Sequence, residues 1–343
     1  MTTEQDSPTS DVMESEHQER DRSYLPSRIL DLASRFGGPG VLFIGIIVFT
    51  FTLPGEFLTT GNIKALLTQQ AVPIVLSLGL LFPLVAGEFD FSGGSLLTLS
   101  ATLLPYFTGI DHLSWPIAVV LILVISCVAG LINGVLVAIF KYNSFVATLA
   151  TGGILSGMSL IISNGATLYA GIPNQFTSLG RGFIVGIPDI VVYAIIVFLI
   201  VAYVLRQTVW GRYHEAIGKG RSASQLAGIS ISRHLIVAFM VSAMAAGLAG
   251  VMLVANLGSA PPAVGGEFIL AAFAAVFLGS TMFRPGFFNA VGTVVAGLLV
   301  AVGVNGLSLF GVSTFIQDIY TGVLLIIAVG LSRLESASWR RGR

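Results

Sequence analysis

Two acidic residues, Glu88 and Asp90, lie between two strongly apolar runs, in the segment Gly87-Glu88-Phe89-Asp90-Phe91-Ser92-Gly93-Gly94-Ser95. A charge at the depth of a bilayer is costly, so such residues usually face a cavity or a partner and often relay protons. The glycines of this segment allow a helix break, which a membrane tolerates only where the freed backbone groups are buried in protein or line water. Two interpretations stay open. Either Glu88 or Asp90 couples transport to protons, or both acids are wet in a tight cytoplasmic turn, with Ser92 as the N-cap of the next helix.

A second group of polar residues occupies 206–233, the longest stretch between apolar runs, which holds five basic residues. Within it, Ser222 to Leu226 suits a short helix that Ser222 caps and Gly228 ends, with Ala223 and Leu226 on one face. A helix of this length is marginal alone and needs something to pack against. The stretch is therefore either a basic loop that only sets membrane topology or a docking helix for a cytoplasmic partner.

This polar stretch does not form a nucleotide site by itself. Gly218-Lys219-Gly220 is similar to the end of a phosphate-binding loop, but that loop needs Gly where Tyr213 stands and Ser or Thr where Gly220 stands. No nucleophile–base pair or metal-ligand spacing occurs elsewhere, and the single Cys127 excludes a disulfide. We therefore expect a protein that is not an enzyme, with no catalytic residue, metal or cofactor of its own.

Composition indicates a membrane protein. Of 343 residues, 55% are hydrophobic and only 10% are charged, whereas a soluble domain carries about 25% charged residues. The 40 glycines suit membrane helices, which use small residues to bring their backbones close. A formal net charge of zero argues against a nucleic-acid partner.

Ten apolar segments predict ten transmembrane helices, since one crossing needs about 20 apolar residues. They lie near 38–54, 66–86, 93–110, 115–140, 145–165, 183–205, 234–256, 268–283, 288–306 and 315–331. The stretch 66–110 is also open to a second interpretation, one broken helix with a re-entrant piece. Loops rich in Lys and Arg stay in the cytoplasm, and ten crossings put 206–233 and both termini on that side.

The chain divides into three predicted parts. Residues 1–36 hold eight acids and four arginines and bury too little apolar surface to fold alone, so they form a disordered cytoplasmic tail. Residues 37–332 form the transmembrane domain, and 333–343 form a basic cytoplasmic tail.

Polar and small residues inside the spans predict helix contacts. Asn133-Gly134 and Asn305-Gly306 occupy similar places late in their spans, which hints at two related halves. An Asn in a span is more often a hydrogen-bonding link between helices than a ligand contact. The four-residue spacing of Gly130 and Gly134 predicts a helix-packing seam.

Three segments carry family-like motifs in order. Gly87 to Gly94 is similar to Gly-Gly-Ile-Asp-Leu-Ser-x-Gly, although Glu88 replaces the second Gly. Residues 145–149 are similar to the end of Pro-Phe-Ile-x-Thr-Leu, and 211–229 to Gly-Arg-x-x-x-Ala-Ile-Gly-x-Asn-x-x-Ala-Ala-x-x-x-Gly-Ile. Over about 40–332 the chain thus resembles the membrane permease subunits of bacterial ABC importers for monosaccharides, the ribose/xylose type.

The resemblance implies the fold of the larger, type II-like ABC importers, in the bacterial inner membrane, as a homodimer or paired with a close relative. A cytoplasmic subunit would bind ATP and magnesium, and an extracytoplasmic substrate-binding protein would deliver a sugar or a similar small polar solute. The contact with the ATPase would be made by Gly211, Arg212, Ala216, Gly218, Ala223, Leu226 and Gly228. The translocation pathway would involve Asp90, Ser92, Asn133, Phe145, Thr148 and Asn305.

Two other classes stay open on the residues alone. One is a stand-alone proton-coupled transporter that uses Glu88 or Asp90, in which neutralising either acid would uncouple transport from protons. The other is a membrane scaffold without transport, which solute uptake by a reconstituted complex would exclude.

Overall fold

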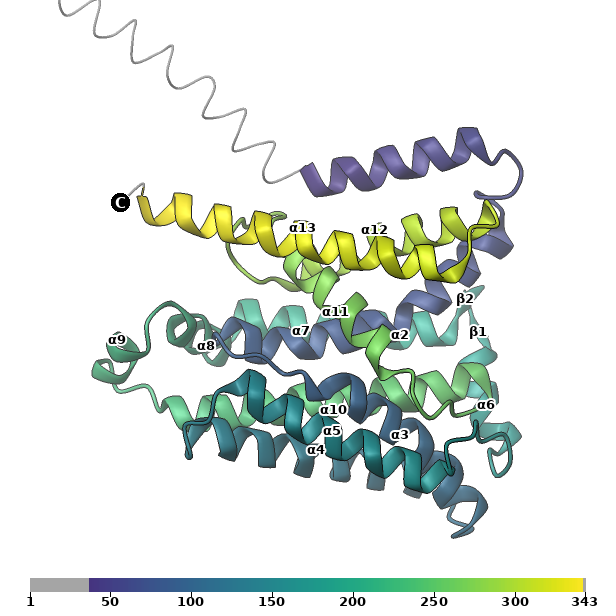
Figure 1. Ribbon diagram of the computed structural model, residues 1–343, viewed down its shortest axis with the longest axis horizontal. Helices are drawn as coiled ribbons and strands as arrows, with labels where there is room; N and C mark the ends of the chain where they lie inside the picture. Colours follow the sequence, from purple (N-terminus) through teal and green to yellow (C-terminus); the bar gives the residue numbers. More distant parts are fainter. Residues whose placement is uncertain (1–36, 342–343) are drawn as a thin grey trace, which may run out of the picture.

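The computed structural model describes residues 37–341 as a helical bundle with one short hairpin (Figure 1). The predicted tail 1–36 lies outside the described residues. A helix over Gly37–Thr52 comes first. It is followed by α2 (Thr60–Val85), α3 (Ser92–Gly109), α4 (Trp115–Ala138), α5 (Ser144–Ser163), α6 (Asn174–Arg181), β1 (Phe183–Ile184), β2 (Ile187–Pro188), α7 (Asp189–Gln207), α8 (Val209–Lys219), α9 (Arg221–Leu226), α10 (Ile231–Leu257), α11 (Gly265–Gly279), α12 (Ala290–Leu309) and α13 (Thr314–Arg341).

The all-helical class is confirmed, and seven helices of the described region are long and apolar enough to cross a membrane. These seven are α2, α4, α5, α7, α10, α12 and, within α13, Thr314–Leu331. Gly37–Thr52 and α11 are apolar but shorter, and α3 is 18 residues long and rich in Ser and Thr. A helix lies at each of the ten predicted segments, while the number of crossings and the side of each terminus stay predictions.

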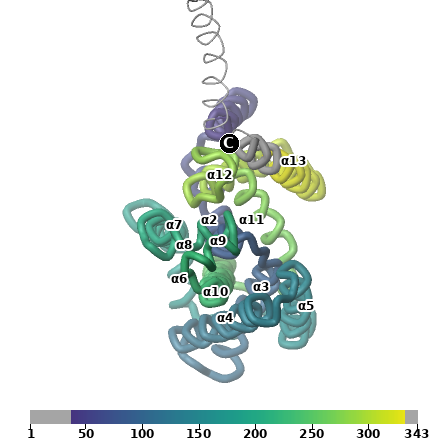
Figure 2. The backbone as a smooth tube through the Cα atoms, turned by 90° about the vertical axis from the view of Figure 1, so that its left-hand side faces the viewer, coloured from purple at the N-terminus to yellow at the C-terminus, as the bar shows by residue number. Residues whose placement is uncertain are grey.

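Helix α2 forms the centre of the bundle. Its most apolar window is 72% buried, against 22% for that of α5 and 6% for that of α13. It packs against α10, α11, α7 and α12, and Figure 2 shows it among these helices when the bundle is viewed from the α8–α9 end. A helix that is apolar on every side belongs in a core, whereas α5 and α13 leave apolar faces for lipid or a partner.

The predicted seam at Gly130 and Gly134 is confirmed, because these glycines bring α4 onto α10. A Cβ at Gly130 would lie 2.5 Å from the carbonyl oxygen of Phe239, and one at Gly134 would lie 2.7 Å from the Cα of Ile236. Without side chains at these two positions, the helix backbones approach closely, as membrane helices require.

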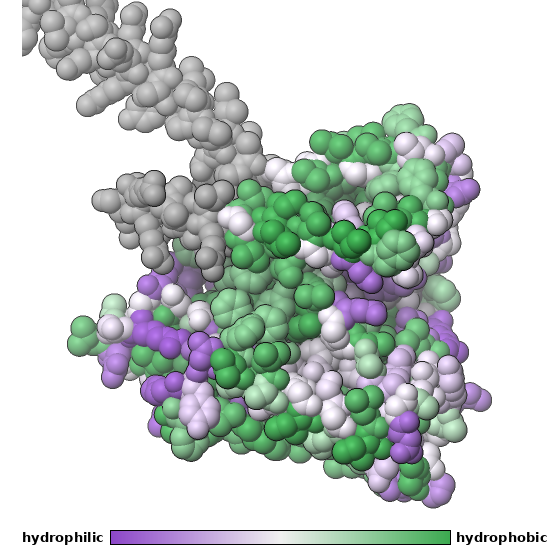
Figure 3. All heavy atoms as spheres, viewed as in Figure 1, coloured by the Kyte–Doolittle hydropathy of each residue, from purple (hydrophilic) through white to green (hydrophobic). Residues whose placement is uncertain are grey.

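The expectation of a loop over 206–233 is wrong in part. Helix α7 runs to Gln207, and α8 then occupies Val209–Lys219, with Thr208 as its N-cap. Helix α9 begins one residue before the predicted start, and Ser222 does not cap it. Gly228 does follow its end with a φ of 80°, as the prediction requires. Figure 3 shows hydrophilic residues gathered where α8 and α9 lie, and hydrophobic residues over the middle of this face.

A hairpin precedes α7, so the predicted span start at residue 183 is also wrong. Strands β1 and β2 pair antiparallel, with Ile184 opposite Ile187. The turn between them places Val185 and Gly186 at positive φ, as a two-residue hairpin turn requires. Val185 is 97% exposed at the tip.

Candidate functional site

The break between α2 and α3 is held by a buried carboxylate. Asp90 is 1% exposed and accepts hydrogen bonds from the Ser92 backbone N–H at 3.1 Å, the Ser92 hydroxyl at 2.5 Å and the Ser242 hydroxyl at 2.8 Å. The interpretation of two wet acids is therefore wrong for Asp90. Ser92 is the first residue of α3 rather than its N-cap, and its backbone N–H, one of the four at a helix start without a partner in the helix, donates to the Asp90 carboxylate.

The network continues from Ser92 into two further helices. The Asn133 side-chain amide of α4 donates to the Ser92 hydroxyl at 2.8 Å, and the Thr151 hydroxyl of α5 donates to the Asn133 side-chain oxygen at 2.7 Å. With Ser242 in α10, one hydrogen-bonded chain joins four helices to the break. Three predicted pathway residues, Asp90, Ser92 and Asn133, thus lie together and are each 1% exposed.

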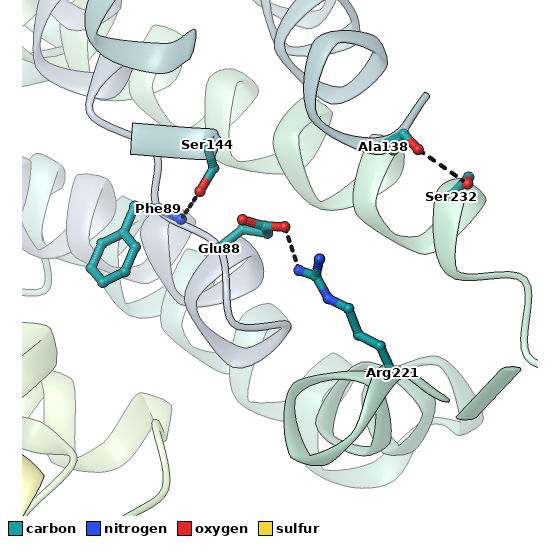
Figure 4. A network of polar contacts seen from close by, with 6 residues as sticks. All are labelled: Glu88, Phe89, Ala138, Ser144, Arg221 and Ser232. Atoms are coloured by element: carbon teal, nitrogen blue, oxygen red, sulfur yellow. Dashed lines mark hydrogen bonds and ion pairs between the residues drawn. The ribbon is translucent and has the colours of Figure 1, made fainter. Parts of the chain in front are cut away.

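The first turn of α5 binds the backbone of the break. The Ser144 hydroxyl accepts from the Phe89 N–H at 3.1 Å (Figure 4), and the Thr148 hydroxyl accepts from the Phe91 N–H at 3.0 Å. The Phe145 ring meets Phe91 edge to face, with centroids 4.8 Å apart. Phe145 and Thr148 therefore belong to the same region as Asp90, and backbone N–H groups freed by the break are satisfied.

Asn305 lies elsewhere. Its side-chain amide exchanges two hydrogen bonds of 2.9 Å with that of Asn62. Asn62 stands in the first turn of α2, while the break follows the last turn of this 26-residue helix. At 1.5 Å per residue the two ends are about 39 Å apart. Asn305 therefore does not join the network of Asn133 but links α12 to α2, and its place in the translocation pathway stays a prediction.

Helices α8 and α9 pack directly on this break. A Cβ at Gly218 would clash with the carbonyl oxygen of Val85, the last residue of α2. Arg221, at the start of α9, forms an ion pair with Glu88 (Figure 4). The Ser232 hydroxyl also donates to the Ala138 carbonyl at 3.4 Å, which ties the chain after α9 to the end of α4.

The remaining predicted coupling residues divide between anchoring and exposed positions. Gly211 is buried, and its N–H donates to the Thr208 hydroxyl that caps α8. Arg212 is exposed and Ala216 is half-buried on α8. Ala223 is exposed on α9, and Leu226 is 91% exposed. Ala223 and Leu226 are thus open to solvent, whereas Gly211 and Gly218 pack inside the chain.

Sequence reasoning missed the aromatic group that fixes α8. The His214 ring is fully buried and stacks on Trp210, with centroids 4.0 Å apart, and Trp210 in turn meets Phe82 of α2. Burial, with a smaller contribution from His234, lowers the pKa of His214 from 6.5 to about 4, so the ring is neutral at pH 7. The four-residue spacing of Trp210 and His214 was the available signal.

The match to known proteins defines a class first. A family described as the permease component of a branched-chain amino acid transport system matches residues 62–329, more than half of the chain. The chain is therefore a membrane permease component, and this family is one of transport proteins rather than enzymes.

Individual relatives narrow the class. The ribose import permease of Bacillus subtilis (strain 168) is 35% identical over 299 residues, 86% of this chain and 92% of the relative. The D-allose transport system permease of Escherichia coli (strain K12) is 32% identical over 306 residues, 88% and 92% of the two chains. The L-arabinose ABC transporter permease of Azospirillum brasilense is 29% identical over 313 residues, which cover 90% of this chain and 91% of the relative. The chain belongs to the permease family of bacterial ABC importers for monosaccharides, the ribose/xylose type, and no solved structure matches it.

Proposed function

We propose that this chain is the membrane subunit of an ATP-driven importer for a sugar or sugar-like small polar solute, and that α9 couples it to a separate ATPase. ATP and magnesium bind on that ATPase, and a substrate-binding protein delivers the solute at the opposite face. The observation that carries the proposal is the contact of α8 and α9 with the α2–α3 break, through Gly218 on Val85 and Arg221 on Glu88.

The ten-span orientation places α9 where a cytoplasmic ATPase can reach it. Arg206, Arg212, Lys219, Arg221 and Arg233 all lie in the stretch around α8 and α9, and such a cluster favours the cytoplasmic side. Both termini then lie in the cytoplasm, and the β1–β2 hairpin lies on the opposite, extracytoplasmic side of the bacterial inner membrane.

The pathway forms along α5, at a contact with a second copy of this chain or a close relative. Phe145 and Leu149 are 45% and 54% exposed on this helix, and Gly153 and Gly157 leave open space where a Cβ would stand. Small residues allow two membrane helices to approach closely. Behind Phe145, the buried hydrogen-bonded residues Asp90, Ser92, Asn133 and Thr148 hold the break on which this ring packs.

Proton coupling through Glu88 or Asp90 is the less favoured function. Glu88 is occupied by Arg221, and both oxygens of Asp90 accept hydrogen bonds from hydroxyls. An acid that relays protons needs a route to water, which a residue 1% exposed lacks.

Co-purification with the ATPase tests the proposal. Gly218→Asp is a poor probe because its side chain would clash with Val85, whereas Ala223→Asp and Leu226→Asp alter only the exposed side of α9. We expect the double variant to lose the ATPase while the membrane chain stays folded.

The matched control is Val185→Asp, which places the same charge on an apolar residue that is 97% exposed. It should keep the ATPase. If no ATPase accompanied the wild-type chain under gentle detergent, the coupling role of α9 would be refuted. Solute uptake driven by a proton gradient in the purified chain alone would support the secondary transporter instead.

A further inference from the structure

A cavity of about 560 Å³ opens beside α8, at the end of the bundle where α2 and α7 finish. Its walls come from the last turns of α2 and α7, from α8, and from the segment 283–291 that leads into α12. The coupling contact of Gly218 with Val85 lies at the edge of this cavity, but no proposed step of coupling or translocation places a ligand inside it.

The polar side of the cavity is positively charged. Three cations line it, Arg206, Lys219 and Arg284, against one acid, Glu215. The Glu215 carboxylate lies 2.9 Å from the Lys219 ammonium and 3.6 Å from the Arg284 guanidinium. With three cations and one acid, the lining carries two positive charges in excess. The Lys219 and Arg284 side chains are about half exposed, at 50% and 56%.

The other side of the cavity is apolar. Leu84, Ala202, Leu205 and Val291 line it, and the Phe287 ring carries Lys219 at 4.7 Å and Arg284 at 5.3 Å from its centroid. Ala290 also lines the cavity and is the first residue of α12. The positive end of the α12 dipole therefore adds to the attraction for an anion.

We infer that this cavity binds the phosphate headgroup of an anionic phospholipid, with an acyl chain along the apolar wall. The inference depends on the proposed membrane orientation, because it needs the ends of α2 and α7 at the bilayer surface. Basic pockets between membrane helices on the cytoplasmic side suit such headgroups. A free phosphate would use the three cations but would leave the wall of Leu84, Leu205 and Val291 without a function.

Native mass spectrometry of the purified full-length chain tests the inference. The chain is incubated with phosphatidylglycerol, or with phosphatidylcholine of the same acyl chains, and bound lipid is counted. We expect one phosphatidylglycerol to be retained in preference to phosphatidylcholine. Arg206→Gln with Lys219→Gln and Arg284→Gln should weaken that binding about 100-fold.

Two further variants separate charge from folding. Lys64→Gln with Lys141→Gln and Arg233→Gln removes as many cations away from the cavity and should leave binding unchanged. Val291→Trp keeps all three cations, but its larger side chain fills part of the cavity beside the apolar wall. This variant should retain less phosphatidylglycerol, while its unfolding temperature stays unchanged. This variant decides the matter if the triple cavity variant does not fold.

Three results would overturn the inference: equal retention by the triple cavity variant, full retention by Val291→Trp, or displacement of the lipid by millimolar inorganic phosphate. The last would assign the cavity to a free anion. Lipid binding needs no partner, so these results are independent of whether Leu226→Asp releases the ATPase.

Discussion

Arg221 and Glu88 form an ion pair across 133 residues of sequence, and it joins the first residue of α9 to the break that follows α2. The Glu88 side chain is 11% exposed and the Arg221 side chain 49%.

Breaking this pair should alter transport more than stability. We expect Glu88→Gln or Arg221→Gln to cost about 1 kcal/mol or less in the free energy of unfolding, because half of Arg221 is in solvent. Solute uptake by the reconstituted complex should fall several-fold. The exchanged pair, Glu88→Arg with Arg221→Glu, should recover part of the loss, and no recovery would show that the pairing itself is not needed.

Asp90 should be a structural anchor. Asp90→Ala leaves the hydroxyls of Ser92 and Ser242 and the Ser92 N–H without their acceptor, and we expect a loss of about 1–3 kcal/mol in stability for each of these donors that stays unsatisfied. Ser242→Ala should cost only about 1–3 kcal/mol. Thermal unfolding in detergent measures both, with the exposed Ser178→Ala as control. A folded, stable Asp90→Ala chain whose uptake no longer depends on pH would instead support proton coupling.

Gly130 tests the contact of α4 with α10. In Gly130→Ala the new Cβ would lie 2.5 Å from the Phe239 oxygen and 2.7 Å from the Ala243 Cβ, so we expect a loss of about 1–3 kcal/mol. Gly153→Ala adds the same methyl group to α5, where nothing lies within 4 Å, and should leave the unfolding temperature of the single chain unchanged. An equal loss in both variants would contradict the packing of this seam.

His214 should make the chain acid-sensitive. Above pH 6.5 the ring is neutral whether the chain is folded or unfolded, and stability does not depend on it. As pH falls from 6.5 to about 4, the unfolded chain binds a proton that the folded chain does not, so stability falls, by about 2 kcal/mol at pH 5. His214→Phe keeps a ring on Trp210 and should flatten the unfolding temperature between pH 7 and 5. His234→Phe should change this slope less, because burial is the larger cause.

Hydropathy predicted where the long helices lie, because each apolar run needs a lipid or protein environment whatever its neighbours are. It did not predict α8 (Val209–Lys219), whose polar sequence is held in place because Trp210 packs on Phe82 and His214 stacks on Trp210. The contact of Asp90 with Ser242 spans 152 residues, and periodicity carries no information on such distances.

The two asparagines show the same limit. Asn133 and Asn305 have the same neighbour in sequence, yet Asn133 bonds to Ser92 and Asn305 to Asn62. The shared dipeptide therefore does not bring the two asparagines into one hydrogen-bonded network. The sequence likewise did not single out Arg221 among the five basic residues of 206–233, because nothing in its neighbourhood indicates that distant Glu88 is its partner.

The close approach of Gly218 to the Val85 carbonyl bears on how motion passes through the protein. Side chains absorb small displacements by changing rotamer, but this contact joins main chain to main chain and has no rotamers to change. If a partner displaces α8, the end of α2 must therefore move by nearly the same amount, or the two helices must separate. We expect this joint to be mechanically stiff, so that a displacement of α8 reaches the last turn of α2 almost undiminished.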